Sequence, residues 1–278
     1  LLVLGVLVIA ATVATGISRR ALLASAEARD AVDRLQSRWW SISAERSVLP
    51  RGEDLLRLAE ADRLQPVTEI ATTLELDGAV FTLELSDDTT RVNPFVLVRQ
   101  GETSTWDREV RSALPAALRP HLDEKRIVGR LLGDPRRALY RDIFRPEAGE
   151  VDGFDDLLTP HGNGAINLLR TDETSLRLAL VPPLSRVEVQ DLLRARRDAF
   201  ETIDEVGRER TLLQMLREAG VSINAGGDVQ LWTAESTRHR LKSVWSNGRR
   251  TTTRTRVVDT DKDRPLDLVR VYRSGELP

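Results

Sequence analysis

The chain has 278 residues, 30% of them charged, and a formal net charge of −2, which excludes a strongly polycationic surface for nucleic acid. It contains no cysteine, so disulfides and thiolate chemistry are excluded as well. The three histidines, His121, His161 and His239, lie far apart, and no pair has a metal-ligand spacing such as HExxH.

The chain opens with an apolar stretch. Residues 1–18 carry no charge and are followed by Arg19 and Arg20. As a helix they would span roughly 27 Å, close to the hydrocarbon thickness of a bilayer. The first residue is leucine, so we expect that the chain has been processed or trimmed. We predict that residues 1–20 form a transmembrane part, with these side chains serving membrane insertion and assembly: Leu1, Leu4, Leu7, Val8, Val13 and Ile17.

The helical pattern continues beyond the apolar stretch. No glycine or proline occurs from Ser18 to Leu49, and apolar residues recur every three or four positions until Pro50 and Gly52. We predict one helix of nearly 50 residues, in which residues 21–49 are amphipathic. One interpretation is a plain membrane anchor with a helical stalk, and the other is a pilin-type helix that moves from membrane to filament. Three side chains are predicted to pack on the protein's own head, although a partner could also cover them: Leu35, Trp39 and Ile42.

Strand signals follow in residues 50–103. Residues 50–66 predict a short helix between two prolines. Alternating apolar residues at 72–76 and 80–85 flank Asp77-Gly78, a strong signal for a hairpin turn. We expect a third short strand in "RVNPFVLV", which begins at Arg91.

The middle of the chain, residues 104–220, reads as helical. Prolines and glycines divide it into short segments, and residues 145–164 form a polar loop. Two helices are expected around Pro182-Pro183, where Ser185 and Glu188 form a capping box. A further helix is expected to stop at Gly220.

Residues 221–278 return to strand patterns, with an Asn247-Gly248 turn and a cleanly alternating "LDLVRVYRS". We predict that these strands pair with the early ones in one antiparallel sheet. The fold class is therefore α+β, with a large helical insertion between strands.

The order of these features resembles the type II secretion system minor pseudopilin K family. Members have two Asn-containing segments, a later "LLxxRxxxxF" segment and a closing hairpin. The matching segments here are Asp87–Asn93, Ile166-Asn167 with Leu176, Leu192–Arg196 with Phe200, and residues 239–258. Phe95 and Leu169 stand where the second asparagine of each segment is expected, and the acid-rich loop of the family is not evident.

The resemblance implies a pilin-like long N-terminal helix packed on an antiparallel sheet. It also implies a non-enzymatic subunit at the tip of the secretion pseudopilus, which helps to initiate the filament with other minor pseudopilins. The subunit would be inserted once in the bacterial inner membrane with its head in the periplasm, after a prepilin peptidase removes its leader. Gly5 stands near the position where main-line pilins carry a glutamate, and the K family also lacks that glutamate.

Calcium is a possible cofactor by resemblance, since family members can bind it in the insertion. Calcium needs six to eight oxygen ligands, usually from carboxylates close in sequence. The nearest candidates are Asp152, Asp155 and Asp156, which we expect to form a solvated acidic loop without a cofactor.

Other function classes find less support. None of the motifs GxSxG, GxxxxGK[ST], GxGxxG or HExxH occurs, so no enzyme is indicated. A helix-hairpin-helix DNA-binding module is conceivable at residues 176–197, where Arg194, Arg196 and Arg197 cluster. However, its hairpin contains two prolines, which cannot donate a backbone hydrogen bond to phosphate, so we expect no nucleic-acid partner. A membrane-anchored periplasmic scaffold unrelated to secretion remains the other alternative.

Overall fold

The computed structural model describes most of the N-terminal third and scattered segments of the remainder. The described residues are 2–76, 78–93, 114, 116–117, 119–121, 157–159, 165–179, 186–202, 205–218, 224–225, 229–230, 232–233, 236–259 and 267–273. Only the backbone is described for 2–11, 186, 201–202, 205–206, 209, 224–225, 229–230 and 267–273. The chain divides into two units, Leu1–Arg46 and Ser47–Pro278, each of which is treated by itself.

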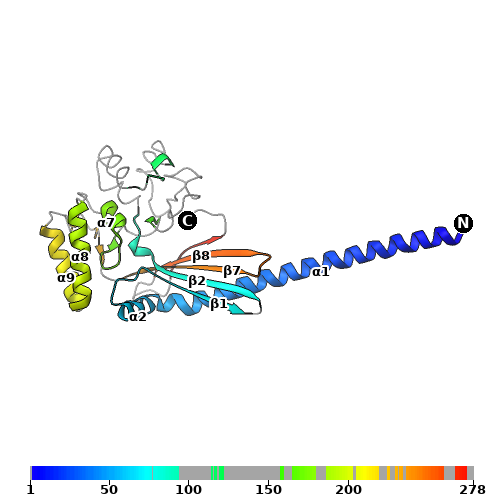
Figure 1. Ribbon diagram of the computed structural model, residues 1–278, viewed down its shortest axis with the longest axis horizontal. Helices are drawn as coiled ribbons and strands as arrows, with labels where there is room; N and C mark the ends of the chain where they lie inside the picture. The colour runs from blue at the N-terminus through cyan, green and yellow to red at the C-terminus, as the bar shows by residue number, and fades with distance from the viewer. Residues whose placement is uncertain are drawn as a thin grey trace. The chain divides into compact units, whose positions relative to one another are not determined.

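The first unit is one helix. Helix α1 runs without interruption through Leu2–Val48, 47 residues, or about 70 Å at 1.5 Å per residue; Figure 1 shows this unbroken rod. The prediction of a single long helix is thus confirmed. It ends where Pro50 follows in a short 3₁₀ turn, Leu49–Arg51, because the residue before a proline disfavours helical backbone.

Side chains along α1 are largely exposed. Val13 and Ile17 are 55% and 64% exposed, and Leu35 and Trp39 are 56% and 63% exposed, while Ile42 is intermediate. The role of Val13 and Ile17 in assembly stays a prediction. The packing of Leu35, Trp39 and Ile42 on the head stays a prediction as well. Among the residues whose side chains are described, no helix is both long enough and apolar enough to cross a membrane.

The head begins with the predicted short helix, α2, at Gly52–Arg63. Glu53 and Asp54 occupy its first turn, where negative charge favours the helix dipole. Leu64 ends it in the left-handed conformation, with φ 51°. Gly52 is required by a close approach, since a Cβ there would lie 2.8 Å from the ring of buried His239.

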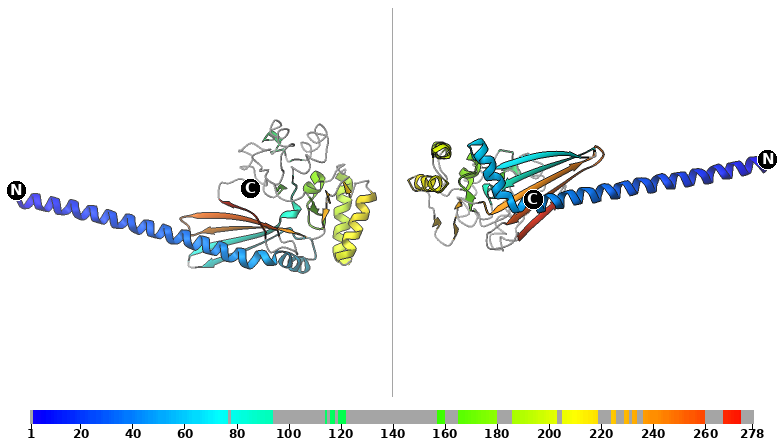
Figure 2. Two further views of the ribbon diagram at one scale, coloured as in Figure 1. Left: turned by 180° about the vertical axis from the view of Figure 1, so that it is seen from behind. Right: turned by 90° about the horizontal axis from the view of Figure 1, so that it is seen from below.

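Five strands form one antiparallel sheet, in the order β1-β2-β7-β8-β9. Figure 2 shows the early strands (cyan) and the late strands (orange) in the same sheet. The strands are β1 (Glu69–Leu76), β2 (Ala79–Asp87), β7 (Arg238–Ser246), β8 (Thr251–Asp259) and β9 (Asp267–Arg273). The predicted pairing of early with late strands is confirmed, because β2 pairs with β7 along its length.

Both predicted hairpin turns are present. Gly78 joins β1 to β2 at φ 76°, and Gly248 lies at φ 77° between β7 and β8, a conformation that glycine adopts without a steric penalty. The second loop has four residues rather than two, because Ser246 pairs with Thr251. The Asn247 side chain holds this loop by accepting bonds from the backbone N–H groups of Arg249 and Arg250.

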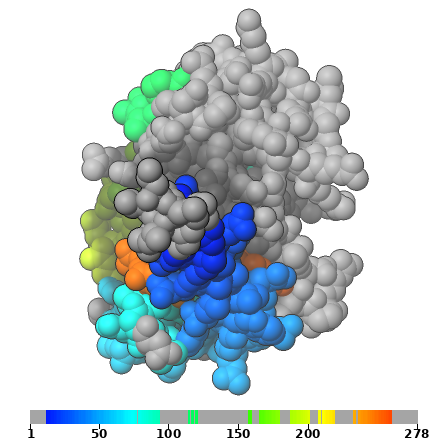
Figure 3. Space-filling view, turned by 90° about the vertical axis from the view of Figure 1, so that its right-hand side faces the viewer, coloured from blue at the N-terminus to red at the C-terminus, as the bar shows by residue number. Residues whose placement is uncertain are grey.

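One face of the sheet supplies the apolar core. Phe81 and Leu85 on β2 lie opposite Trp245 and Leu241 on β7, and all four side chains are less than 5% exposed. The edge strand β1 is different, since seven of its eight residues are exposed. The cyan part of the chain, which includes β1, lies at the surface in Figure 3.

Between β2 and β7 the chain contains the expected helices around Pro182-Pro183 and before Gly220. These are α7 (Glu173–Ala179), α8 (Arg186–Thr202) and α9 (Glu205–Glu218). Short strand pairs that the sequence did not predict are β3 (Ile166–Asn167) with β6 (Trp232–Thr233), and β4 (Asn224–Ala225) with β5 (Val229–Gln230). The helices expected between Ser104 and residue 146 lie almost entirely outside the described residues.

The third strand expected at "RVNPFVLV" needs correction in its described part. Asp88–Thr90 form a 3₁₀ turn, and Val92 makes only an isolated parallel bridge with Leu158. The Asp87 side chain caps this turn by accepting bonds from the backbone N–H and the hydroxyl of Thr89, a local arrangement that aspartate often adopts. Residues 94–98 lie outside the described part.

Candidate functional site: a buried ionic cluster and its pocket

The turn after β2 carries two fully buried aspartates. Asp87 and Asp88 are both 0% exposed. The Asp87 carboxylate accepts hydrogen bonds from the backbone N–H of Thr89, at 2.9 Å, and from its hydroxyl. It thereby caps the 3₁₀ turn and fixes the direction in which the chain leaves the sheet.

Asn167 joins the second predicted segment to the first. Its Nδ2 donates to Asp87 Oδ2 at 3.1 Å and to Ser236 Oγ at 3.0 Å. Its Oδ1 accepts from the backbone N–H of Leu169 at 3.0 Å. The two segments that suggested a family resemblance, 80 residues apart in sequence, therefore meet at one carboxylate.

Arg170 is the centre of the cluster. Its side chain is 4% exposed and bonds Glu53 at 2.7 Å, Glu60 at 2.6 Å and Asp87 at 3.4 Å. It also donates to Ser236 at 2.7 Å. Burial alone would lower the pKa of Arg170, but the bonds to Glu60 and Glu53 outweigh burial and raise the pKa, so the guanidinium stays charged.

Glu53 is held in its ionised form. Burial alone would raise its pKa, but the polar contacts of His239 and Arg170, the charge of Arg170 and the bond from Arg57 together hold the pKa well below the ordinary value. His239 Nε2 lies 3.7 Å from Glu53 Oε2. A carboxylate with several donors is favoured in its charged state even when it is partly buried.

Asp88 ties the cluster to strand β7 on its other side. Arg240 donates from Nε to Asp88 Oδ1 at 3.0 Å, and Thr159 donates to Oδ2 at 2.7 Å. Arg91 lies 3.7 Å from the same carboxylate. The two adjacent aspartates thus bind different segments. Asp87 binds the segment at Asn167, whereas Asp88 binds β7 and the segment at Thr159.

Chemically, this arrangement is a set of buried cross-links. It connects α2, the end of β2, the β3 turn and the start of β7 through charge-assisted bonds, which are stronger than neutral ones. A carboxylate that takes part in a reaction must be able to contact the substrate. The carboxylates of Asp87 and Asp88 each already accept hydrogen bonds from several donors within the protein. The cluster is therefore suited to fixing the shape of the head.

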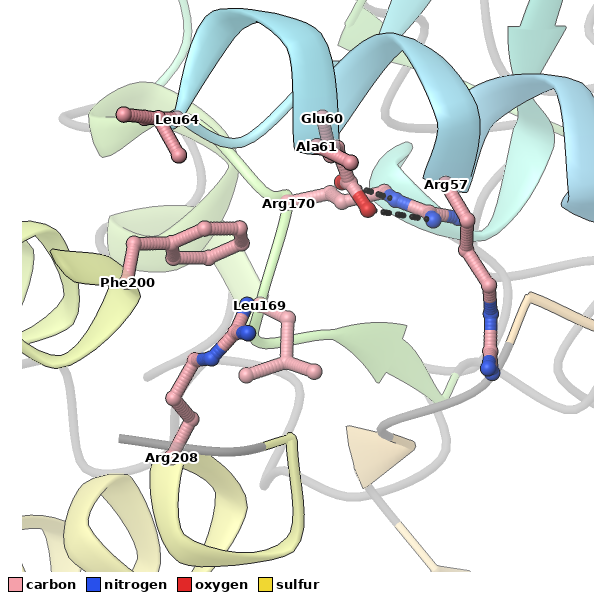
Figure 4. A pocket seen from close by; sticks show the side chains of 8 residues that line it. All are labelled: Arg57, Glu60, Ala61, Leu64, Leu169, Arg170, Phe200 and Arg208. Atoms are coloured by element: carbon pink, nitrogen blue, oxygen red, sulfur yellow. Dashed lines mark hydrogen bonds and ion pairs between the residues drawn. The ribbon is translucent and has the colours of Figure 1, made fainter. Parts of the chain in front are cut away.

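A pocket of about 190 Å³ adjoins the cluster. Figure 4 shows its walls, which include the Glu60–Arg170 pair and the stacked side chains of Phe200 and Arg208. Leu169, which stands where the family resemblance leads one to expect a second asparagine, is 6% exposed and lines the pocket. The third predicted segment contributes Phe200.

The helix-hairpin-helix alternative loses support at its arginines. Arg196 Nη1 donates to the carbonyls of Leu168 and Thr171 at 3.1 and 2.6 Å, and burial lowers its pKa to about 10. Arg194 pairs with Asp191 at 2.9 Å. Two of the three clustered arginines are thus engaged within the protein.

The predicted calcium ligands Asp152, Asp155 and Asp156 lie outside the described residues. Within the part that the structure describes, no three histidine, aspartate or glutamate side chains are grouped to hold a metal ion.

Several residues of the cluster were not predicted: Glu53, Glu60, Arg170, Ser236 and Arg240. A partial signal exists for the first two, since residues seven apart share a helix face. For Arg170 the sequence contains only one signal, which is its position three residues after Asn167.

Comparison with known proteins finds a likeness among solved structures. No protein-family model matches the chain, and no curated protein matches it. Among solved structures, the chain is similar to a chain of the GspK-GspI-GspJ complex from the enterotoxigenic Escherichia coli type 2 secretion system. The two are 15% identical, with a TM-score of 0.44, over 89% of this chain and 99% of that chain.

Proposed function

We propose that this chain is a minor pseudopilin, a non-enzymatic subunit at the tip of a type II secretion pseudopilus. The observation that carries the proposal is the unbroken helix Leu2–Val48 on a chain whose early and late strands share one sheet. A plain anchor needs no such continuity, because a flexible linker would serve it equally well.

The helix supplies the mechanism. Residues 1–18 carry no charge, so they suit a lipid bilayer and a bundle of similar helices about equally. Helix association in membranes rests on close packing rather than on the hydrophobic effect, so exchange between the two settings has a modest net cost. Such a subunit can be stored in the inner membrane, with its head in the periplasm, and then be drawn into a filament. Leader removal by a prepilin peptidase would precede this step.

The region between β2 and β7 supports a tip position. It adds helices α7, α8 and α9 to the head between two paired strands. A head enlarged in this way would obstruct a further subunit above it, so it would serve as a cap and as a starting point for assembly. Other minor pseudopilins are the expected partners.

The test is co-purification of the tagged full chain, extracted in mild detergent, with the minor pseudopilins of the same organism. A stoichiometric complex is expected, together with reduced protein export when the chain is deleted. A useful control is Val8→Asp against Val8→Ala, since only the charged variant should prevent membrane insertion. Recovery of the folded chain without any pilin-like protein, and with export unchanged after deletion, would favour the unrelated scaffold. A DNA band shift that weakens with salt would favour nucleic-acid binding.

A further inference from the structure

The outer edge of strand β1 has backbone groups that face away from the sheet. β1 pairs with β2 and with no other strand in the part of the chain that the structure describes, and Figure 1 shows it at the edge, beyond β2. The backbone N–H of Asp87 donates to the carbonyl of Thr68 at 3.0 Å, one step beyond the pair of Glu69 with Ser86. Because hydrogen-bonded and non-hydrogen-bonded pairs alternate along antiparallel strands, every second residue of β1 directs its N–H and C=O groups outward. Those residues include Ala71, Thr73 and Glu75.

This edge lacks the features that commonly protect a sheet edge from other strands. Natural edge strands are protected by lysine, proline, β-bulges or short length. β1 has eight residues, Glu69–Leu76, without lysine, arginine or proline, and its register with β2 runs without a bulge from end to end. The opposite edge strand, β9, contains Arg270 and Arg273, and a register shift interrupts its pairing with β8. Of the two edges, β1 is therefore the one suited to accept a further strand.

Leucine side chains border the open edge on the core side of the sheet. Leu74 lies opposite Phe81 in the register of β1 with β2. Phe81 is 4% exposed, whereas Leu74 and Leu76 are 48% and 51% exposed. A further antiparallel strand would place its residues opposite these leucines in non-hydrogen-bonded pairs, in which the two Cα atoms are about 4.5 Å apart. Apolar side chains at those positions would cover the leucines and extend the core face.

The other face of β1 favours a basic partner strand. Glu75 is exposed and lies opposite Val80 on β2, so a cation can be placed opposite it only from the outer side. The strand contains a second glutamate, Glu69, and no basic residue. Opposite charges stabilise paired strands and like charges destabilise them. Two copies of β1 would bring charged side chains of one sign to the shared ladder, which disfavours pairing of this edge with itself.

We propose that the edge of β1 binds an extended segment of a partner protein as an additional antiparallel strand. The segment has apolar side chains at alternate positions, opposite Leu74 and Leu76. Threonine and basic side chains lie between them, with a lysine or arginine opposite Glu75. Its backbone bonds the outward groups of Ala71 and Thr73, as in the strand addition by which many proteins bind peptides. The proposal rests on the edge of the sheet alone and holds whether or not the chain is a pseudopilin.

The test is calorimetric titration of the full chain, in mild detergent, with the peptide VTVKVTVKV, which is acetylated and amidated at its ends. In the proposed register the N–H groups of its threonines and lysines point toward β1, and those of its valines point away. N-methylation of the threonines and lysines should therefore lower the affinity at least about tenfold, because several hydrogen bonds are lost. N-methylation of the valines should leave the affinity within about twofold of that of the parent peptide.

Amide hydrogen exchange, measured by NMR for each residue, shows where the peptide lies. The N–H groups of Ala71, Thr73 and Glu75 should exchange more slowly once the peptide is bound, because each then donates to the peptide backbone. The N–H groups of Thr72 and Leu74 face β2 and should change little. This alternation is expected from strand addition and not from binding through side chains alone.

Three variants locate the binding on β1. Ala71→Pro removes one outward N–H group, and proline is tolerated on an edge strand when its nitrogen faces solvent. It should weaken binding at least about threefold, because one hydrogen bond is lost and the ring obstructs the incoming strand. Ala71→Thr keeps the N–H group and is the matched control, whose affinity should equal that of the parent. Glu75→Lys should weaken binding of VTVKVTVKV and strengthen binding of VTVEVTVEV. Thermal unfolding shows whether each variant is folded, and the N-methylated peptides test the proposal on the unaltered chain.

Four results would overturn the proposal. The first is the absence of saturable binding by VTVKVTVKV at millimolar concentration. The second is an equal effect of the two N-methylation patterns, and the third is equal affinity of the Ala71→Pro and Ala71→Thr variants. The fourth is reversible dimerisation of the chain without peptide, measured by analytical ultracentrifugation and abolished by Ala71→Pro, which would assign the edge to a second copy of this chain.

Discussion

Replacing Arg170 with methionine tests whether the ionic cluster holds the head together. The variant preserves most of the side-chain volume and removes a cation that bonds three carboxylates at once, those of Glu53, Glu60 and Asp87. Asp87 is 0% exposed and would lose the guanidinium that lies 3.4 Å from its carboxylate. Breaking a buried pair by removing one member costs about 3–5 kcal/mol.

This cost is large for the head. Domains are stable by about 5–15 kcal/mol in total, so the variant would lose a large fraction of the free energy of unfolding. For a domain of this size each kcal/mol lowers Tm by about 2–4 °C. We therefore expect Arg170→Met to lower Tm by about 6–20 °C, measured by circular dichroism of the full chain in mild detergent at pH 7.

The matched control is Arg57→Met, which removes an arginine from the edge of the same cluster. Arg57 is 42% exposed and pairs with Glu53 at 2.8 Å. A pair of this kind contributes about 0–1 kcal/mol, so Tm should fall by no more than about 4 °C. Adding Asp87→Asn to Arg170→Met should recover part of the loss, because it removes the unpaired charge. Equal shifts for the two arginine variants would refute the reasoning.

Three further predictions concern neighbouring residues. Gly52→Ala should destabilise the head by about 1–3 kcal/mol in chemical denaturation, because the new Cβ meets His239 at 2.8 Å. Helix propensity alone would instead raise the free energy of unfolding by about 1 kcal/mol. In a His239→Ala background the steric cost of Gly52→Ala should disappear. Glu53 contributes stability that is present above its ordinary pKa of 4.5 and is lost as pH falls below that value toward the depressed folded-state pKa; Glu53→Gln should therefore make the acid dependence of stability shallower. Asn167→Asp replaces the amide that donates to Asp87 with a second carboxylate, so it should destabilise the head by about 1–3 kcal/mol in chemical denaturation; an unchanged free energy of unfolding would contradict this.

Much of the framework could be predicted from local patterns. The absence of glycine and proline from Ser18 to Leu49 predicted the long helix, and the Asp77-Gly78 and Asn247-Gly248 dipeptides predicted both hairpins. That early and late strands share one sheet followed from matching two strand-rich regions that flank a helical one, although the pairing of β2 with β7 in particular was not predicted. These features depend on periodicity and turn chemistry, which short windows of sequence contain.

The ionic cluster could be predicted only in part. The resemblance singled out Asp87 and Asn167. It did not predict that Arg170 would bond Glu53, which is 117 residues away. Ion pairs across such distances leave no periodic signal, and arginine is common throughout this chain. The third strand, expected to begin at Arg91, was wrong in its described part for a related reason: the apolar residues there suggested a strand, while Asp87 before them caps a 3₁₀ turn.

The sheet has a consequence for the timing of folding. Arg240 on β7 bonds Asp88, which lies 152 residues earlier in the chain. Ribosomes add about 5–20 residues per second, so β2 waits about 8–30 seconds after its own synthesis before its partner strand exists. Throughout that delay its outer hydrogen-bonding edge and the apolar faces of Phe81 and Leu85 are unsheltered, and two ionised aspartates await their counterions. A newly made chain is therefore most vulnerable to aggregation and proteolysis until its last fifth has been synthesised.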